Sequence, residues 1–188
     1  MYNFNWMKEP TGRKKLLPAA ALWEFAVKSL GARACSAGEL RRKLVQKAER
    51  AADVDDVISR LRDYGYLNDR RFAESYAGAR LENQGLGRSR VLRDLRQRKV
   101  SDGLAEGAVD RIYKNVDEME LIDSFIRKKV RTKKPLPEAL EDPSQLASAY
   151  RKLIRAGFSS SNVILALKRI AKGQVLLDSF EPPEEIEE

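Results

Sequence analysis

Histidine is absent from this 188-residue chain, and cysteine occurs only once, at Cys35. Without histidine the chain lacks the most common general base and the most common metal ligand of proteins. One cysteine can form neither an intrachain disulfide nor a zinc site, so we interpret Cys35 as a small buried residue in a reducing compartment. No Gly-x-x-x-x-Gly-Lys-Ser/Thr phosphate loop occurs either. These absences favour a protein that is not an enzyme and that uses no cofactor and no metal.

Long apolar runs are missing as well. No stretch approaches the roughly 18 apolar residues of a membrane span, and residues 1–15 lack the apolar region of a signal peptide. We therefore expect a cytoplasmic protein with no membrane partner. Charged residues make up 34% of the chain, and the formal charge is +8. This excess of cations favours an anionic partner, either nucleic acid or the acidic face of a protein, without choosing between them.

Apolar residues recur at helical spacing along most of the chain. One run has members at positions i, i+3, i+4 and i+7, on one face of a helix: Val54, Val57, Ile58 and Leu61. No stretch shows the sustained alternation that a half-buried strand requires. The sequence therefore predicts an all-α protein.

Start and stop signals mark nine predicted helices. These begin at or beside Pro18, Ser36, Asp53, Asn68, Ser89, Ser101, Asp117, Asp142 and Ser160 or Ser161. Ser36 and Glu39 have the spacing of a capping box, and Gly65 is placed to end a helix in a left-handed conformation. The helix that begins at Asp117 is predicted to reach Lys134, where residues 135–137, Pro-Leu-Pro, form a connector.

The nine helices fall into three units of three. Leu44, Leu95 and Leu153 each lie near the end of a middle helix, 51 and 58 residues apart. A period near fifty residues predicts a tandem array of three-helix repeats, elongated, curved and monomeric. The predicted organisation is an N-terminal arm (1–17), three repeats (18–67, 68–115 and 116–173) and an acidic, disordered tail (174–188).

The basic charge is concentrated outside that tail. Residues 178–188 hold six acidic and no basic residues, so removing them raises the formal charge from +8 to +14. Two basic clusters stand out: Arg88, Arg90, Arg93, Arg96, Arg98 and Lys99, and then Arg127, Lys128, Lys129, Arg131, Lys133 and Lys134.

We expect partner contact from both clusters, through Arg88, Arg90, Arg93, Arg96, Arg127, Lys128, Lys129 and Arg131. Arg90 and Arg93 are predicted to project, solvated, from the side opposite the core. The alternative for the second cluster is a solvated helix C-terminus, where the macrodipole favours cations. Aromatic residues do not interleave with these cations in the sequence, and Phe72 and Tyr76 are expected to pack in the core with Tyr66.

Several motifs resemble those of the RecX regulatory proteins. Residues 65–73, Gly-Tyr-Leu-Asn-Asp-Arg-Arg-Phe-Ala, are similar to the family pattern G-Y-L-(D/N)-D-x-R-F-A. Residues 36–44 resemble S-x-x-E-L-x-x-K-L, residues 87–95 resemble G-x-x-R-I-x-x-x-L, and residues 153–158 resemble L-x-x-x-G-F. The likeness runs from Leu22 to Ile170. Lys99 and Ala48 depart from it, because they replace glycines common at the ends of the middle helices.

The resemblance implies a regulator that binds the RecA–DNA filament. Members of this family modulate RecA, mostly by inhibition, and so restrain ATP hydrolysis, strand exchange and SOS signalling in DNA repair. Their fold is three tandem three-helix repeats, and single-stranded DNA is reached through the filament. The resemblance supplies no residue set for the contact itself.

A helix-turn-helix-like DNA-binding regulator is the alternative function. Such a protein reads bases with polar side chains near the start of a recognition helix. Here the third helices of the first two repeats begin with acidic residues, including Asp53 and Asp102, which would repel DNA. The sequence therefore favours the filament regulator.

Overall fold

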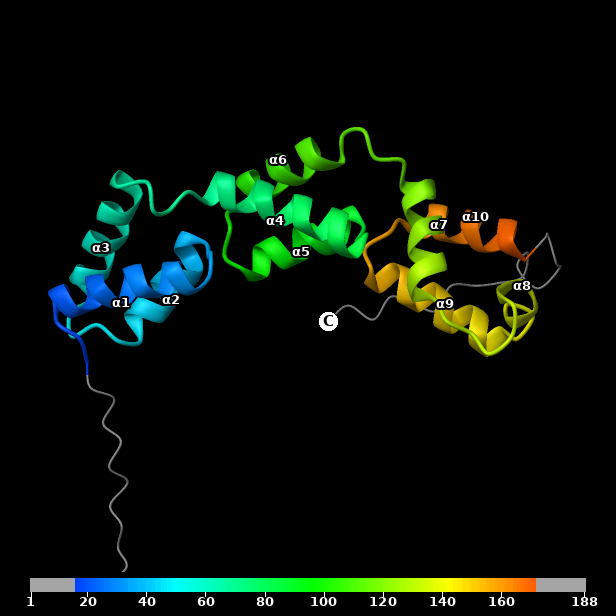
Figure 1. Ribbon diagram of the computed structural model, residues 1–188, viewed down its shortest axis with the longest axis horizontal. Coiled ribbons are helices and arrows are strands. Elements are labelled where there is room, and N and C mark those ends of the chain that lie inside the picture. The colour runs from blue at the N-terminus through cyan, green and yellow to red at the C-terminus, as the bar shows by residue number, and fades with distance from the viewer. Residues whose placement is uncertain (1–15, 172–188) are drawn as a thin grey trace, which may run out of the picture. The chain divides into compact units, whose positions relative to one another are not determined.

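The computed structural model describes residues 16–171 (Figure 1). The described part is helical, with one isolated β-bridge between Leu17 and Ala48, so the prediction of an all-α protein is confirmed. The arm before residue 16 and the acidic tail lie outside the described residues. The chain divides into two compact units, residues 1–68 and residues 69–188.

The first unit contains three helices, α1 (Ala19–Ala32), α2 (Ala37–Val45) and α3 (Ala51–Asp63). Their inward faces meet in one apolar cluster whose fully buried members include Leu22, Leu40, Leu44, Val54 and Leu61. The second unit contains α4 (Asp69–Gln84), α5 (Arg88–Gln97), α6 (Asp102–Tyr113), α7 (Glu118–Lys129), α8 (Leu136–Ala139), α9 (Pro143–Arg155) and α10 (Ser160–Ile170). It holds one apolar cluster for α4–α6 and another for α7–α10. The exact limits of the repeats, 18–67, 68–115 and 116–173, stay predictions.

The core between α4 and α6 is built largely of alanine. Ala73 and Ala77 of α4 and Ala105 and Ala108 of α6 are at most 3% exposed, and α4 packs more extensively on α6 than on any other helix. Small side chains let two helices approach closely, because the interaxial distance is set by the residues at the contact. Alanines therefore line the contact between α4 and α6, while bulkier buried members of the cluster, such as Val91, Leu95 and Val109, come from α5 and α6.

The two clusters of the second unit meet where Gly87 faces Gly157. The Gly87 amide donates to the Ala156 carbonyl (2.8 Å), and the Ser89 amide donates to the Gly157 carbonyl (3.2 Å). A β-carbon on Gly87 would lie 2.3 Å from the Gly157 carbonyl oxygen. Leu86, beside this contact, packs against both clusters. The segment before α5 and the segment before α10 thus interlock through their backbones.

Several predicted helix starts are confirmed by side-chain caps. The Ser36 hydroxyl accepts from the Glu39 amide (3.0 Å), and the carboxylates of Asp117 and Asp142 cap α7 and α9. The third helix was expected to begin at or beside Asp53, but Asp53 does not cap it. α3 begins at Ala51, and Asp53 is buried in its first turn, paired with Arg50 at 2.6 Å.

The region after α7 differs from its prediction. α7 ends at Lys129, five residues before Lys134, because Val130 turns extended (φ −89°, ψ 106°) and packs against the last cluster. The predicted connector at 135–137 overlaps a tenth helix of the described residues, α8, which runs on to Ala139. Proline is tolerated in a first helical turn, where amides have no partner within the helix.

The Gly-Tyr-Leu segment after α3 places its side chains differently from our expectation. Gly65 is left-handed (φ 73°), as predicted, and Leu67 is buried. Tyr66, expected in the core with Phe72 and Tyr76, is 58% exposed. Phe72 and Tyr76 do pack against the α4–α6 cluster, as expected, and they stack on each other with ring centroids 6.0 Å apart.

Lys99 ends α5 in the conformation that glycine normally supplies. Its φ is +61°, and it is the one non-glycine residue with positive φ among residues 16–171. Its amide donates to Arg96 (2.9 Å), and the Val100 amide donates to Leu95 (3.2 Å). Gly157 closes α9 through the same pair of bonds, to Ile154 and Leu153. Ala48, the other departure from the family pattern, avoids positive φ and forms the β-bridge to Leu17.

Truncating any of the three repeated leucines should destabilise the protein. Leu44, Leu95 and Leu153 are each fully buried, as predicted, and a buried leucine replaced by alanine loses roughly 2–5 kcal/mol of unfolding free energy. Urea unfolding of each variant measures the loss. Leu165→Ala is the control, because Leu165 is 56% exposed and its truncation should change the free energy by no more than roughly 0.5 kcal/mol. A fully stable variant of any of the three would contradict the repeat alignment there.

Lys99→Gly should stabilise the protein. A left-handed conformation costs a residue with a β-carbon roughly 1 kcal/mol, and glycine adopts it freely. The greater freedom of glycine in the unfolded chain offsets part of this, so we expect a gain of up to roughly 0.5 kcal/mol by urea unfolding. Lys114→Gly is the matched control, because Lys114 ends α6 with φ −52° and should lose stability. Destabilisation of both variants alike would show that Lys99 is unstrained.

Candidate functional site

The first basic cluster lies along α5. Val91 and Leu95 are fully buried on the inner side of this helix, which leaves its arginines at the surface. Three of the four arginines that we selected there pair with carboxylates of the second unit. These pairs are Arg88–Asp110, Arg90–Asp94 (2.9 Å), Arg96–Asp102 (2.7 Å) and Arg96–Glu106 (3.0 Å). The arginine side chains remain 42–55% exposed, so the pairs are surface pairs of small energy that an anionic partner can replace.

Arg90 does not project freely into solvent, which corrects the prediction. It lies against the junction of the two clusters, where its backbone amide would be 2.3 Å from a β-carbon on Gly157. Its guanidinium also donates to the Arg155 carbonyl (3.3 Å) at the end of α9. Arg90 therefore links α5 to α9 as well as adding charge to the surface.

Arg93, in contrast to Arg90, is exposed to solvent as predicted. It forms no ion pair with any acidic residue that the structure describes. Its charge is the least compensated among the selected positions of α5.

An aromatic ring lies among the arginines near this cluster, although the sequence does not interleave them. The guanidinium carbons of Arg80 and Arg98 each lie 4.7 Å from the centroid of the Tyr76 ring. The Tyr76 hydroxyl donates to the carboxylate of Asp94 (3.2 Å), which also accepts from Arg90. Sequence spacing could not indicate this network, because it joins α4 to α5.

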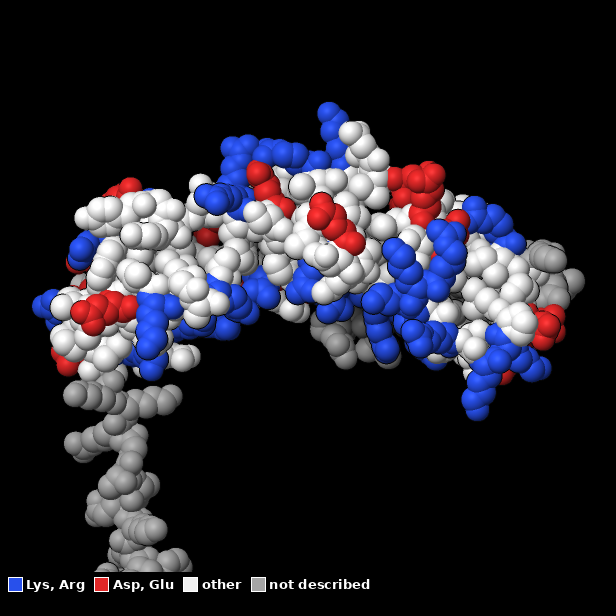
Figure 2. All heavy atoms as spheres, in the orientation of Figure 1, with Lys and Arg blue, Asp and Glu red and all other residues white. Residues whose placement is uncertain are grey.

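The second basic cluster spans the end of α7 and the segment that follows it. Arg127, Lys128 and Lys129 occupy the last helical turn, and Arg131 follows in extended chain. All four are exposed, and among the described residues none of their side chains pairs with a carboxylate. Lys152 of α9 adds a further cation here, since its amino group donates to the Lys129 carbonyl. Figure 2 shows Lys and Arg side chains gathered over α7 and the nearby end of α9.

The N-terminus of α10 is occupied by a carboxylate from α7. Glu118 accepts from the amide (2.9 Å) and the hydroxyl of Ser159 and from the side-chain amide of Asn162. Burial alone would raise the pKa of Glu118, but these hydrogen bonds outweigh it and hold that pKa below its ordinary value. Glu118 is thus an internal cap that ties the start of α7 to the start of α10.

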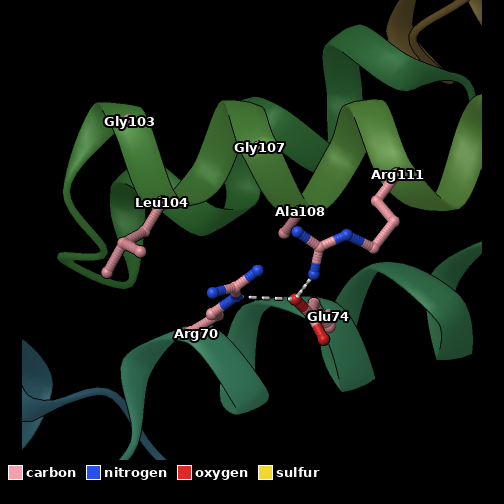
Figure 3. Close-up of a pocket in the computed structure, with 7 residues that line it drawn as sticks. All are labelled: Arg70, Glu74, Gly103, Leu104, Gly107, Ala108 and Arg111. Carbon is pink, nitrogen blue, oxygen red and sulfur yellow. Dashed lines mark hydrogen bonds and ion pairs between the residues drawn. The ribbon is translucent and has the colours of Figure 1, made fainter.

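A depression lies between α4 and α6 of the second unit (Figure 3). Glu74 points into it between Arg70 and Arg111 and accepts from both guanidinium groups. Gly103 and Gly107 form the opposite wall. Since the one carboxylate is already bound by two arginines, the arrangement links α4 to α6 and offers no free acid or base.

Tyr113 has a shifted pKa but no catalytic setting. Burial raises the pKa of its hydroxyl to about 12, and the hydroxyl donates to the Leu86 carbonyl (2.7 Å). Within residues 16–171 no group of three or more His, Cys, Asp or Glu side chains is placed to hold a metal ion. No helix in the same range has the length and apolarity needed to cross a bilayer.

The sequence of the chain is similar to those of known proteins that share one description. Residues 68–109 match the family described as "RecX, second three-helix domain". The chain is 32% identical over 168 residues to the "Regulatory protein RecX" of Deinococcus radiodurans, covering 89% of this chain and 74% of that protein. It is 28% identical over 140 residues to the "Regulatory protein RecX" of Haemophilus influenzae (73% and 87% covered).

Solved structures share the fold. The crystal structure of RecX from Lactobacillus salivarius matches with a TM-score of 0.65 at 18% identity, covering 82% of this chain and 97% of that chain. A second crystal structure, of "regulatory protein RecX", matches with a TM-score of 0.59 at 18% identity, covering 80% and 73%.

Replacing Glu118 by glutamine should lower stability at neutral pH and have less effect in acid. A carboxylate with a lowered folded-state pKa contributes stability that is present above its unfolded pKa, roughly 4.3, and is lost as the pH falls through the folded pKa. We expect Glu118→Gln to lose roughly 1–2 kcal/mol of unfolding free energy at pH 7, and the gap to the parent to narrow by pH 3. Urea unfolding at both pH values measures this.

Glu120→Gln is the matched control. Glu120 lies in the same first turn of α7 and is exposed, with no side-chain partner among the described residues. The difference in unfolding free energy between the two variants gives the contribution of the hydrogen bonds to Ser159 and Asn162. An equal, small effect of both would show that the Glu118 cap contributes little.

Proposed function

Because the chain belongs to the RecX family of regulatory proteins, we propose that it binds the RecA–DNA filament and modulates RecA, chiefly by inhibition. The observation that carries the proposal is the 32% identity to a regulatory protein RecX across 89% of the chain. In this role the protein is a cytoplasmic monomer without enzymatic activity, acting in recombination, DNA repair and the SOS response. Single-stranded DNA is met within the filament.

The charge distribution supports an anionic surface on the partner. Residues 69–171 contain 22 basic and 14 acidic residues, whereas residues 16–68 contain nine and seven. The excess of cations thus belongs to the second unit, which carries both basic clusters. Several weak contacts along one filament add up to useful affinity, because each contact after the first is intramolecular.

We assign direct contact first to the uncompensated cations Arg93, Arg127, Lys128, Lys129 and Arg131. Their charges meet no carboxylate among the described residues, so a phosphate or an acidic side chain of the filament gains their full attraction. Arg88, Arg90 and Arg96 are about half exposed and paired. They contribute by exchanging an internal carboxylate for an external anion.

The helix-turn-helix alternative is further weakened by the starts of the third helices. Asp55 near the start of α3 pairs with Arg41, and Asp102 begins α6. α10 begins with serines and Asn162, which could contact bases, but the carboxylate of Glu118 occupies its N-terminus. Each candidate recognition helix therefore has a carboxylate at its start, where a DNA reader would need a free polar donor. The carboxylates of Asp55 and Asp102 are paired with Arg41 and Arg96.

The proposed function is tested by RecA ATPase activity on single-stranded DNA with and without this protein. We expect the parent to inhibit, and Arg127→Glu/Lys128→Glu to inhibit at least roughly tenfold more weakly, with a gap that shrinks as salt is raised. Arg42→Glu/Lys43→Glu is the matched control. Those residues are exposed cations in the last turn of α2, so the control has the same charge change and the same loss at a helix C-terminus.

Circular dichroism establishes that both double variants are folded. A parent without any effect on RecA would overturn the proposed function. An active parent whose two double variants inhibit equally would remove the second cluster from the contact, and Arg93→Glu then tests α5.

A further inference from the structure

Four side chains of the first unit form an exposed aromatic patch, which we call the Trp23 patch: Trp23, Arg60, Tyr64 and Tyr66. The Trp23 and Tyr64 rings meet edge to face with centroids 5.8 Å apart, and the Tyr64 and Tyr66 centroids are 6.4 Å apart. The Arg60 guanidinium carbon lies 4.4 Å from the centroid of the Trp23 ring. α1 and α3 thus contribute rings and a cation to one surface.

Two rings of this patch, Tyr64 and Tyr66, lie outside the buried core of the first unit. Tyr64 and Tyr66 are 65% and 58% exposed. The turn is closed by Gly65 with φ 73° and by the Tyr66 amide, which donates to the Leu61 carbonyl (2.9 Å), and Leu67 supplies the buried side chain. Large exposed apolar groups that gather together mark interaction sites.

We propose that the Trp23 patch is a docking surface for a folded protein, one that offers an apolar pocket for a tyrosine ring flanked by a carboxylate. Tyrosine, tryptophan and arginine are the residues that dominate the binding energy of protein–protein interfaces. The guanidinium of Arg60 stacks on Trp23 and pairs with no acidic residue that the structure describes. It is therefore free to receive the carboxylate.

The charges nearby favour a protein over a nucleic acid. The first unit is almost balanced, with nine basic and seven acidic residues between positions 16 and 68, and Figure 2 shows both signs mixed over α1–α3. Glu24 and Asp63, each adjacent in sequence to a ring of the patch, are exposed acids. Binding of single-stranded nucleic acid combines stacking rings with a positive groove for phosphates. The Trp23 patch contains rings and the single cation Arg60, with exposed acids nearby in the sequence.

The inference rests on the proposed function, because the protein used to test it is the RecA filament. The test compares the parent, Tyr64→Ala/Tyr66→Ala and the control Val45→Ala. Val45 is an exposed apolar residue of the same unit (50%) that lies outside the patch. Circular dichroism checks the fold, and affinity is measured for filaments of RecA on single-stranded DNA and, separately, for labelled oligo(dT) alone.

We expect the double tyrosine variant to lose roughly tenfold or more affinity for the filament while its affinity for oligo(dT) stays within about twofold of the parent. Val45→Ala should match the parent in both assays. If the double variant is unfolded, Tyr66→Ala alone replaces it, since the contact described for that ring is with Tyr64.

Three results would overturn the inference in distinguishable ways. Unchanged filament affinity in a folded variant would remove the patch from any interface with RecA. An equal loss of affinity for oligo(dT) would reassign the patch to base stacking. A parent that does not bind the filament would overturn the proposed function, and the inference with it.

Tryptophan fluorescence tests independently whether the patch stacks on bases. The chain has two tryptophans, so Trp6→Phe leaves Trp23 as the one reporter. Its emission should be unaffected by oligo(dT), and quenching by oligo(dT) would favour base stacking and contradict docking of a protein.

Discussion

The close backbone contact between Gly87 and Gly157 holds the second unit together. A β-carbon at Gly87 would lie 2.3 Å from the Gly157 carbonyl oxygen, and one at Gly157 would lie 2.3 Å from the Arg90 amide nitrogen. Neither position therefore accepts a side chain without separating the two segments. The contact also compensates for a missing cap, because α5 has no side-chain N-cap and its first amides would otherwise lack partners. The Ser89 amide is satisfied across the junction, by the Gly157 carbonyl. This contact, together with the hydrogen bond from Arg90 to the Arg155 carbonyl, fixes how the arginines of α5 lie relative to α9.

The two basic surfaces differ in whether their cations form ion pairs, and not in how closely the cations are spaced. The α5 arginines are the more crowded in sequence, yet carboxylates from α5 and α6 compensate three of the four that we selected. The cations that end α7 are followed by a segment without acidic residues up to position 137, and Lys152 approaches from α9. A phosphate therefore meets competition at the first surface and little at the second. The near-neutral first unit offers aromatic rings instead, so the chemistry of contact differs between the two units.

Local signals predicted most of the fold, and the errors have local causes of their own. Ser36, Asp117 and Asp142 were recognised as helix starts because their capping bonds involve only neighbouring residues. The end of α7 was missed because Val130 leaves the helix to reach a tertiary core. Tyr66 was expected in the core because aromatic residues usually bury their rings, whereas Leu67 is the buried residue of that turn.

For the candidate site, the sequence located the cations but not their partners, since ion pairs such as Arg88–Asp110 join residues of different helices. Both junction glycines lie in recognised motifs, yet no sequence rule indicates that they touch.

The alanine-lined contact between α4 and α6 limits how far this part of the sequence can diverge. A core of leucines and valines can exchange volume among neighbours, so one residue enlarges while another shrinks. The α4–α6 contact lacks this freedom, because its side chains are alanines with almost no volume to lose: Ala73, Ala77, Ala105 and Ala108. Any larger side chain there pushes the two helix axes apart. Substitutions are therefore tolerated less in the middle of the chain than in the leucine-rich clusters on either side.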